Sequence, residues 1–173
     1  SLERVDAIEL AREFNAVVIA SAAGEKDLPS TTEERLANLE RLMPRLKAAG
    51  FGPGRLHVDP LVFPISVDGR NGLGFLDTVR AVRNTYGPDI HIVAGLSNVS
   101  FGMPNRKLIN LVFTHMAVQA GADGGIVDPL QINLETLNSL DEEAESYQLA
   151  RALLTGEDDF GMNYIMASRE GKL

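Results

Sequence analysis

Polar side chains that could bind a small heterocycle follow three apolar segments of the sequence. Two of these segments finish Val-Asp-Pro, at Asp59-Pro60 and Asp128-Pro129. A carboxylate can accept two parallel hydrogen bonds from a heterocycle that carries an amino group beside a ring N–H, as it does from a guanidinium. Each aspartate could equally cap a turn or a helix, because its short side chain readily accepts a nearby backbone N–H. The residues alone leave both roles open.

The third apolar segment runs into Gly-Leu-Ser-Asn-Val-Ser, residues 95–100, which contains Gly95, Ser97 and Asn98. The Asn98 amide can donate or accept a hydrogen bond whatever the pH, so it suits a neutral ring nitrogen whose protonation changes during a reaction. Its alternative role is an Asx turn or a cap. Arg106 begins the next helical pattern, where a positive charge opposes the helix dipole, and this favours contact with an anion.

The composition favours one domain with a sizeable core, because the chain has 173 residues of which 45% are hydrophobic. Its 24 acidic residues outnumber its 16 basic ones, for a formal net charge of −8, which disfavours nucleic acid as a partner. Cysteine is absent, which excludes disulfides and thiol chemistry. No signal peptide is recognisable and no apolar run approaches the roughly 20 residues of a membrane span, so we expect a cytoplasmic protein.

The histidines do not predict a metal site. His57 and His91 fall in predicted strands, and His115 falls in an apolar helical pattern, so core or surface positions are expected. No Ser-His-Asp order can be recognised. Neither the glycine pair at 52–54 nor the pair at 72–74 both follows a strand and opens a helix, as a phosphate-binding loop would.

Helical patterns and short apolar runs alternate along the chain, and the helices and strands that they predict must position the polar residues. Continuous runs rich in β-branched residues predict strands buried on both faces. Ser30 and Glu33 have capping-box spacing, and Gly50 and Gly121 stand where left-handed helix ends are expected. The predicted strands are residues 15–21, 55–60, 89–95 and 124–129; the predicted helices are residues 2–11, 30–50, 76–86, 105–120 and 133–154; the tail from Thr155 has no assignment.

The predicted strand ends recur about every 35 residues, which is the period of a βα unit repeated in a parallel sheet. A doubly wound sheet or a (β/α)8 barrel would cover both faces of such strands. In both folds ligands bind beyond the carboxyl ends of the strands, where Ser21, Asp59, residues 95–98 and Asp128 are expected. The spacing therefore predicts a parallel α/β fold with a polar ligand site, and four units make half a barrel.

Three segments together resemble the pterin-binding methyltransferases, which exchange a methyl group between methyltetrahydrofolate and a corrinoid protein: residues 95–110 (GLSNVSFGMPNRKLIN), 58–64 (VDPLVFP) and 120–129 (AGADGGIVDP). The similarity in order and spacing extends over nearly the whole chain. It implies a (β/α)8 TIM barrel, often a homodimer, with the pterin in the barrel mouth. The four strands would be the fifth to the eighth, and residues 1–173 the C-terminal part of a single pterin-binding barrel domain that lacks its N-terminal half.

The resemblance also implies roles for individual residues. Asp59 matches the carboxylate that binds the amino-pyrimidine edge of the pterin. Asn98 matches the asparagine that hydrogen-bonds the nitrogen bearing the methyl group. Phe101 stands where a polar residue is expected, and another Asp and Asn that the family supplies from its early strands are missing here. The remaining predicted pterin-binding residues are Gly95, Ser97, Arg106 and Asp128.

The implied reaction is a displacement in which cobalt(I) of a corrinoid attacks the methyl carbon, while Asn98 follows the changing charge on the amine nitrogen. Tetrahydrofolate or methyltetrahydrofolate is then a substrate, a corrinoid protein is the partner, and the chain itself binds no metal. Two alternatives stay open. Dihydropteroate synthase shares the barrel and the pterin pocket, although residues 163–173 lack the late Arg-x-His segment of that family. A half-barrel could also bind folate without catalysing a reaction.

Overall fold

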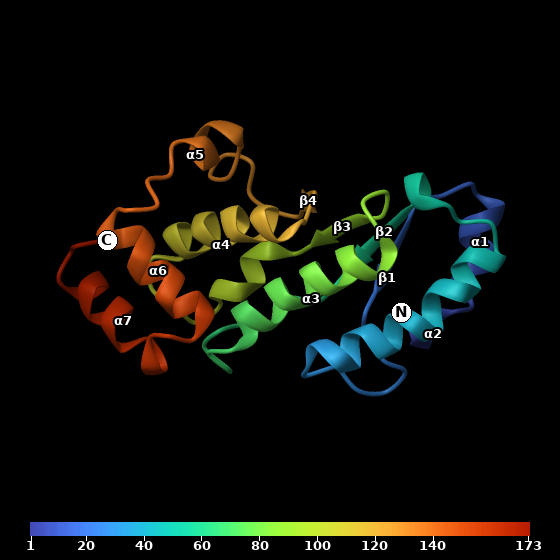
Figure 1. The fold of residues 1–173 in the computed structure, drawn as a ribbon, viewed down its shortest axis with the longest axis horizontal. Coiled ribbons are helices and arrows are strands. Elements are labelled where there is room, and N and C mark those ends of the chain that lie inside the picture. The colour runs from blue at the N-terminus through green and yellow to red at the C-terminus, as the bar shows by residue number, and fades with distance from the viewer. The chain divides into compact units, whose positions relative to one another are not determined.

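The fold is α/β, with a four-stranded sheet in the order β1-β2-β3-β4, in a computed structural model that describes all of residues 1–173 (Figure 1). β1 pairs with β2 and β2 with β3, both in parallel, which confirms the predicted parallel sheet. The strands are β1 (Val18–Ser21), β2 (Leu56–Asp59), β3 (His91–Ala94) and β4 (Gly124–Gly125). The α-helices are α1 (Ala7–Glu13), α2 (Thr32–Ala48), α3 (Asn71–Tyr86), α4 (Arg106–Ala120), α5 (Leu134–Asn138), α6 (Glu145–Thr155) and α7 (Met162–Arg169), and the short 3-10 helices are η1 (Leu2–Arg4), η2 (Pro53–Arg55), η3 (Leu96–Ser100) and η4 (Asp159–Gly161).

The chain divides into two compact units, which are described separately below. Helix α3 contributes residues 71–76 to unit 2 and residues 77–86 to unit 1. Unit 1 consists of Ser1–Leu61, Asp77–Ala94 and Gly121–Gly124, and unit 2 consists of Val62–Leu76, Gly95–Ala120 and Gly125–Leu173.

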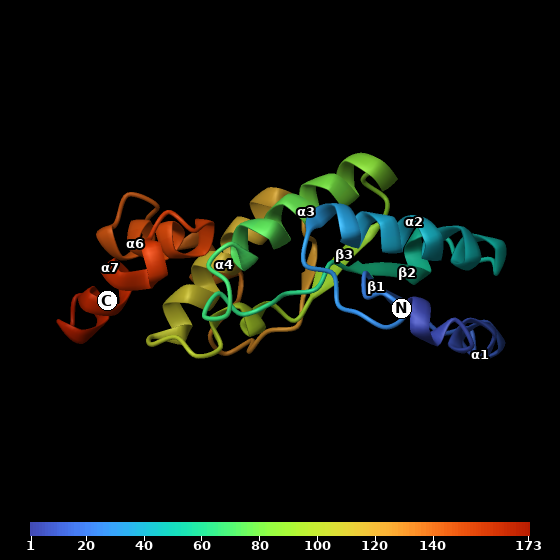
Figure 2. The same cartoon turned by 90° about the horizontal axis from the view of Figure 1, so that it is seen from below.

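In unit 2 the helices α4, α6 and α7 form the main packing (Figure 2), with α4 against α6 and α6 against α7. The rings of Phe75 and Phe113 lie with their centres 5.2 Å apart in this core. Gly72, near the start of α3, lies so close to the backbone of Leu154 that a Cβ would collide with the Leu154 carbonyl oxygen. This close approach explains a glycine inside a helix, where it otherwise costs about 1 kcal/mol.

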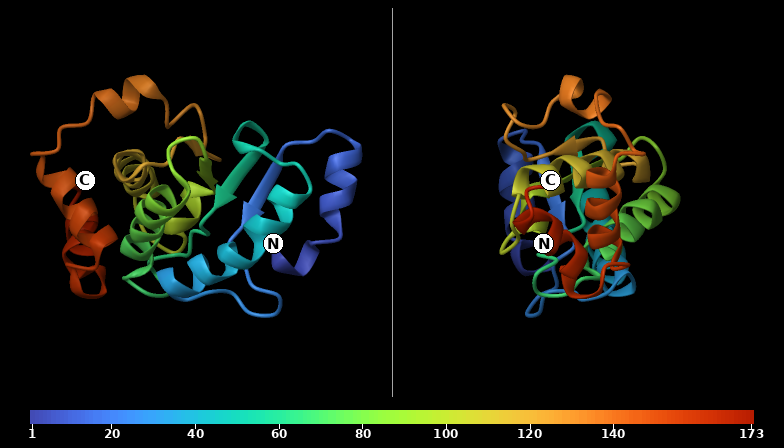
Figure 3. Two further views of the ribbon diagram at one scale, coloured as in Figure 1. Left: turned by 45° about the vertical axis from the view of Figure 1, so that its right-hand side comes forward. Right: turned by 90° about the vertical axis from the view of Figure 1, so that its left-hand side faces the viewer.

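In unit 1 the parallel register places Val18 opposite Leu56 and Ser21 opposite Asp59, so β1 and β2 end side by side (Figure 3). Helix α2 packs against β1 and buries Leu39 and Leu46. A capping box starts α2, with the Thr31 hydroxyl and the Glu34 carboxylate each accepting the other residue's backbone N–H. The predicted box at Ser30 and Glu33 was therefore wrong by one residue.

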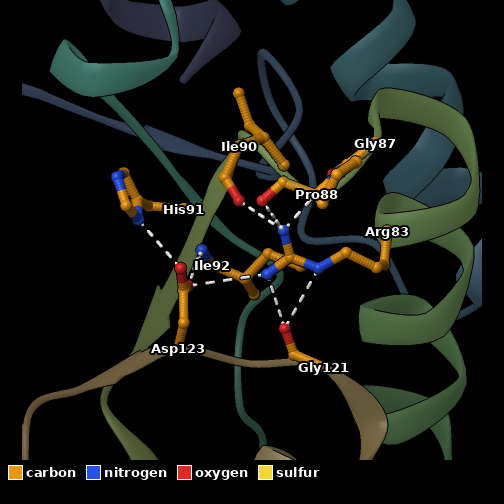
Figure 4. Close-up of polar contacts among 8 residues, drawn as sticks. All are labelled: Arg83, Gly87, Pro88, Ile90, His91, Ile92, Gly121 and Asp123. Atoms are coloured by element: carbon orange, nitrogen blue, oxygen red, sulfur yellow. Dashed lines mark hydrogen bonds and ion pairs between the residues drawn. The ribbon is translucent and has the colours of Figure 1, made fainter.

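Arg83 of α3 joins several backbone segments of unit 1 (Figure 4). Its Nη1 donates to the carbonyl of Ile90 at 2.5 Å and to those of Pro88 and Gly87 at 3.0 and 3.3 Å. Its Nη2 and Nε donate to the Gly121 carbonyl at 2.6 and 3.2 Å. Arg83 thus ties the end of α3 both to the start of β3 and to the segment that leads to β4.

Asp123 completes the same cluster (Figure 4). Its Oδ1 accepts the Ile92 N–H at 2.7 Å and lies 3.6 Å from Arg83 Nη2, while its Oδ2 lies 2.8 Å from His91 Nδ1. Burial alone would raise the pKa of Asp123, but the Ile92 N–H, His91 and Arg83 together lower it. Asp123 therefore supplies a charged acceptor beside β3.

Several predicted elements differ in extent. Helix α3 begins at Asn71, five residues before its prediction, because Gly72 and Gly74 interrupt the apolar pattern at its start. The fourth strand is only Gly124–Gly125, since the following residues turn around Asp128. The single helix predicted over 133–154 is instead α5 and α6, separated by turns, although Asn133 caps α5 as predicted. The unassigned tail contains α7.

The predicted left-handed helix ends at Gly50 and Gly121 are confirmed by φ values of +86° and +112°. None of the helices combines the length and the apolar character that crossing a bilayer requires.

Candidate functional site

The polar segment after β3 forms η3 in unit 2, and the burial of its apolar residues orients it. Leu96 and Val99 are 2% and 0% exposed, and the Val99 carbonyl accepts the Ile65 N–H at 3.0 Å. Asn98, between them, is exposed. The buried side chains of Leu96 and Val99 therefore anchor the segment in the core of unit 2, and Asn98 between them lies at the surface of that unit.

The side-chain amide of Asn98 makes no hydrogen bond within the chain. Its backbone is held, because the Asn98 N–H donates to the Gly95 carbonyl and the Asn98 carbonyl accepts the Phe101 N–H, both at 3.2 Å. The amide is thus neither an Asx turn nor a helix cap in this structure. Gly95 leaves space for it, since a Cβ there would lie 3.2 Å from Asn98 Nδ2.

Arg106 binds the same segment from the first position of α4. Its Nε donates to Ser100 Oγ at 2.9 Å, its Nη2 donates to the Ser97 carbonyl at 3.0 Å, and its guanidinium carbon lies 4.5 Å from the centre of the Phe101 ring. These contacts hold η3 around Asn98 and use the cation in a π interaction. They account for a positive charge at a helix start, and the predicted anion contact of Arg106 stays a prediction.

Gly95, Ser97, Asn98 and Arg106 therefore lie together in unit 2, and their roles in pterin binding stay predictions. Sequence reasoning missed the roles of Ser100 and of Ser66, whose hydroxyl donates to the Phe101 carbonyl at 2.5 Å. Ser66 is 35 residues away in sequence and carries no local signal.

Asp59 lies in unit 1, at the carboxyl end of β2. Its Oδ1 accepts the Leu61 N–H at 2.9 Å, so the turn-capping role is real, and Leu61 has a left-handed φ of +68°. Its Oδ2 makes no hydrogen bond within the chain. Burial raises the pKa of the carboxyl group, and the Leu61 N–H only partly opposes this effect. A carboxylate in such surroundings would be stabilised by a ligand that donates hydrogen bonds to Oδ2.

Asp128, in unit 2, is exposed and fully engaged in its own turn. Oδ1 accepts the Leu130 N–H at 3.0 Å and Oδ2 accepts from Gln131 Nε2 at 2.6 Å. These contacts are those of a capping aspartate, and its role in pterin binding stays a prediction.

The histidines have other partners. His57 and His91 stack with ring centres 4.8 Å apart, and His115 Nδ1 lies 3.1 Å from the Tyr147 hydroxyl. No group of three or more His, Cys, Asp or Glu side chains in residues 1–173 is placed to hold a metal ion.

Comparison with known proteins places these features in a family. A family model described as pterin binding enzyme matches residues 2–128. The chain is 31% identical over 156 residues to the methylcorrinoid:tetrahydrofolate methyltransferase of Eubacterium limosum, covering 90% of this chain and 54% of that protein. It is 30% identical over 135 residues to the methionine synthase of Mycobacterium leprae, covering 74% of this chain and 11% of that protein, and 29% identical over 147 residues to that of Mycobacterium tuberculosis, covering 81% and 12%.

The chain belongs to the family of pterin-binding enzymes. This membership confirms the resemblance drawn from the Gly-Leu-Ser-Asn-Val-Ser motif, and with the parallel sheet it confirms the predicted α/β fold of the TIM-barrel type. The chain spans about half the length of the first relative and a smaller part of the methionine synthases. That residues 1–173 form the C-terminal part of one barrel domain stays a prediction.

Proposed function

We propose that this chain takes part in methyl transfer between tetrahydrofolate and a corrinoid carried by a partner protein. The observation that carries the proposal is the exposed Asn98 amide, which makes no hydrogen bond within the chain although the backbone N–H and carbonyl of Asn98 are both hydrogen-bonded. Support also comes from the relatives, one of which is named as a methylcorrinoid:tetrahydrofolate methyltransferase. The corrinoid supplies the cobalt that gives up or accepts the methyl group.

Asn98 would serve the folate nitrogen that carries the methyl group. In the methylated state this nitrogen has a lone pair and no hydrogen, so it can accept from Asn98 Nδ2. In the demethylated state it carries a hydrogen, a proton exchanged with water at the exposed site during the transfer, and can donate to Asn98 Oδ1. An amide offers both groups without a proton of its own to lose, so it can follow the change in either direction of transfer.

Asp59 would bind the amino-pyrimidine edge of the pterin through Oδ2, while Oδ1 keeps its bond to Leu61. A ring N–H or amino group facing Oδ2 would offset the cost of burying the charge. Gly95 and Ser97 would line the pterin site, and Arg106 would hold the segment that presents Asn98. A pterin contact by Asp128 would require it to exchange a local partner.

The partner in this proposal is a corrinoid protein, and the proposed assembly is a homodimer. Both follow from the family resemblance. Sedimentation of the native protein, alone and with a corrinoid protein, measures each association directly.

The test is single-turnover methyl transfer, followed by the cobalt absorbance, with folate affinity measured on the same samples. Asn98→Ala should lower the transfer rate at saturating folate by about tenfold or more, because oriented donors contribute most where charge changes in the transition state. Folate affinity should fall less than the rate does.

Asn133 provides the matched control, because its side chain does cap a helix, accepting the Thr136 N–H at 3.1 Å. Asn133→Ala should cost about 1 kcal/mol of stability and leave transfer unchanged. If Asn98→Ala behaves like Asn133→Ala, Asn98 has only a structural role and the proposed mechanism is wrong.

A further inference from the structure

A tyrosine near the C-terminal end of the sequence contacts the residue that precedes α4. Tyr164, on α7, is 0% exposed, and its hydroxyl donates to the Asn105 carbonyl at 3.1 Å. Both residues belong to unit 2. Tyr164 lies beyond residues 2–128, the part of the chain that matches the family model.

Asn105, which accepts this hydrogen bond, has an unusual backbone conformation at the start of α4. It has a left-handed φ of +44°, which asparagine adopts more readily than most residues but still at some cost. Its carbonyl also accepts the Leu108 N–H at 3.2 Å, so it fixes the first turn of α4. The next residue is Arg106, whose guanidinium binds the Ser97 carbonyl and the Ser100 hydroxyl.

Helix α7 is itself anchored where it begins. Asp158 is 5% exposed, and its two carboxylate oxygens accept the N–H groups of Asn163 and Tyr164 at 3.0 and 2.9 Å. Before α7, Phe160 and Gly161 both have left-handed φ values, which turn the chain so that Asp158 can reach these N–H groups. Burial raises the pKa of Tyr164, so its hydroxyl remains a donor over the whole working pH range.

We propose that Tyr164 is a positioning residue for methyl transfer, because its hydrogen bond to Asn105 fixes Arg106 and thereby the segment that presents Asn98. The proposal rests on the proposed function for its catalytic consequence. Its structural part is that the Tyr164 hydrogen bond restricts the motion of the η3 segment, and this can be tested without measuring activity. A displacement of about 1 Å in a group that orients a substrate is enough to slow a reaction considerably.

Tyr147 offers a closely matched control. It is also a buried tyrosine of unit 2, 3% exposed, and its hydroxyl makes one side-chain hydrogen bond, at 3.1 Å to His115. That bond joins α6 to α4 far along the helix from Asn105 and touches no residue of the η3 segment. Tyr164→Phe and Tyr147→Phe therefore remove the same group at similar structural cost, while only the first acts on the candidate site.

The experiment compares both variants with the wild-type protein in three measurements: thermal melting, amide hydrogen exchange over residues 96–108, and single-turnover methyl transfer at saturating folate. We expect similar losses of melting temperature. Exchange at Asn98, Phe101 and Leu108 should become faster in Tyr164→Phe alone, and its transfer rate should fall by about three- to tenfold, the usual range for one lost hydrogen bond.

Unchanged exchange over residues 96–108 in Tyr164→Phe, or equal effects of the two variants on exchange, would overturn the positioning role. A loss of transfer of the same size in both variants would overturn it too. If the wild-type protein transfers no methyl group, the proposed function fails, and the exchange measurement alone decides whether Tyr164 fixes the segment.

Discussion

The replacement Arg83→Met should destabilise unit 1 strongly, because one side chain binds four backbone carbonyl oxygens there (Figure 4). Methionine retains the length and most of the apolar stem of arginine but donates no hydrogen bond. The carbonyls of Ile90 and Gly121 would lose their closest donors, at 2.5 and 2.6 Å. Asp123 would also lose the nearby positive charge.

The expected cost follows from these two short bonds. A hydrogen bond to a charged group contributes about 1.5 to 3 kcal/mol, so two of them give about 3 to 6 kcal/mol. The Arg83 side chain is 21% exposed, and water can partly replace the lost donor, which favours the lower half of that range. We therefore expect Arg83→Met to lower the free energy of unfolding by about 3 to 4 kcal/mol. Arg83→Lys should recover less than half of this loss, since an ammonium cannot span both groups of carbonyls.

The assay is urea unfolding, with the midpoint and the slope measured for each variant. Arg80→Met is the control, because Arg80 lies one turn earlier on α3, pairs with Asp77 at 2.8 Å and is 52% exposed. An exposed pair of this kind contributes less than about 1 kcal/mol. If Arg83→Met and Arg80→Met unfold within 1 kcal/mol of each other, the carbonyl contacts of Arg83 do not stabilise the protein and the reasoning is refuted.

Two further predictions concern the candidate site. Burial raises the pKa of Asp59 above its unfolded value, so its contribution to stability is present at low pH and is lost as pH rises through the folded pKa. The Asp59→Asn variant should therefore melt at a higher temperature than the wild type at pH 7, and the difference should vanish below about pH 4. Equal melting temperatures at every pH would contradict the stability prediction. The same variant should bind pterin more weakly by about 1 to 3 kcal/mol in titrations. The Gly95→Ala variant should have nearly the same melting temperature as the wild type, because Gly95 has an ordinary φ of −75°. It should transfer the methyl group more slowly, because the added Cβ would crowd the Asn98 amide. An unchanged transfer rate would show that the amide does not need this space.

Signals within a few residues of each other made most of the fold predictable. Parallel strands follow from apolar runs about 35 residues apart, and helix ends follow from Gly50 and Gly121. Errors arose where a local signal had a long-range cause. The helix predicted over 76–86 was too short at its start: Gly72 lies inside α3, where its missing side chain lets the helix approach the Leu154 backbone in the core of unit 2. The capping box was displaced by one residue because Ser30 and Thr31 are both good caps, and only the geometry selects Thr31.

In the candidate site, too, local sequence signals did not reveal contacts between residues that are far apart in the sequence. Types and spacing made Asn98 and Arg106 candidates, because polar side chains cluster where an apolar strand ends, and the family resemblance gave Gly95 a pocket role. The same reasoning could not tell which of two aspartates keeps an oxygen without a hydrogen bond: Asp59 uses one oxygen in its turn, whereas Asp128 uses both. Nor could it find Tyr164, which is 59 residues from Asn105 in sequence and lies in a tail without a clear pattern. A hydrogen bond between distant segments leaves no periodicity in the sequence, since any tyrosine in a helix satisfies the same apolar pattern. Candidate ligand-binding residues can therefore be inferred from local chemistry, while contacts between distant segments become visible only when the fold brings the partners together.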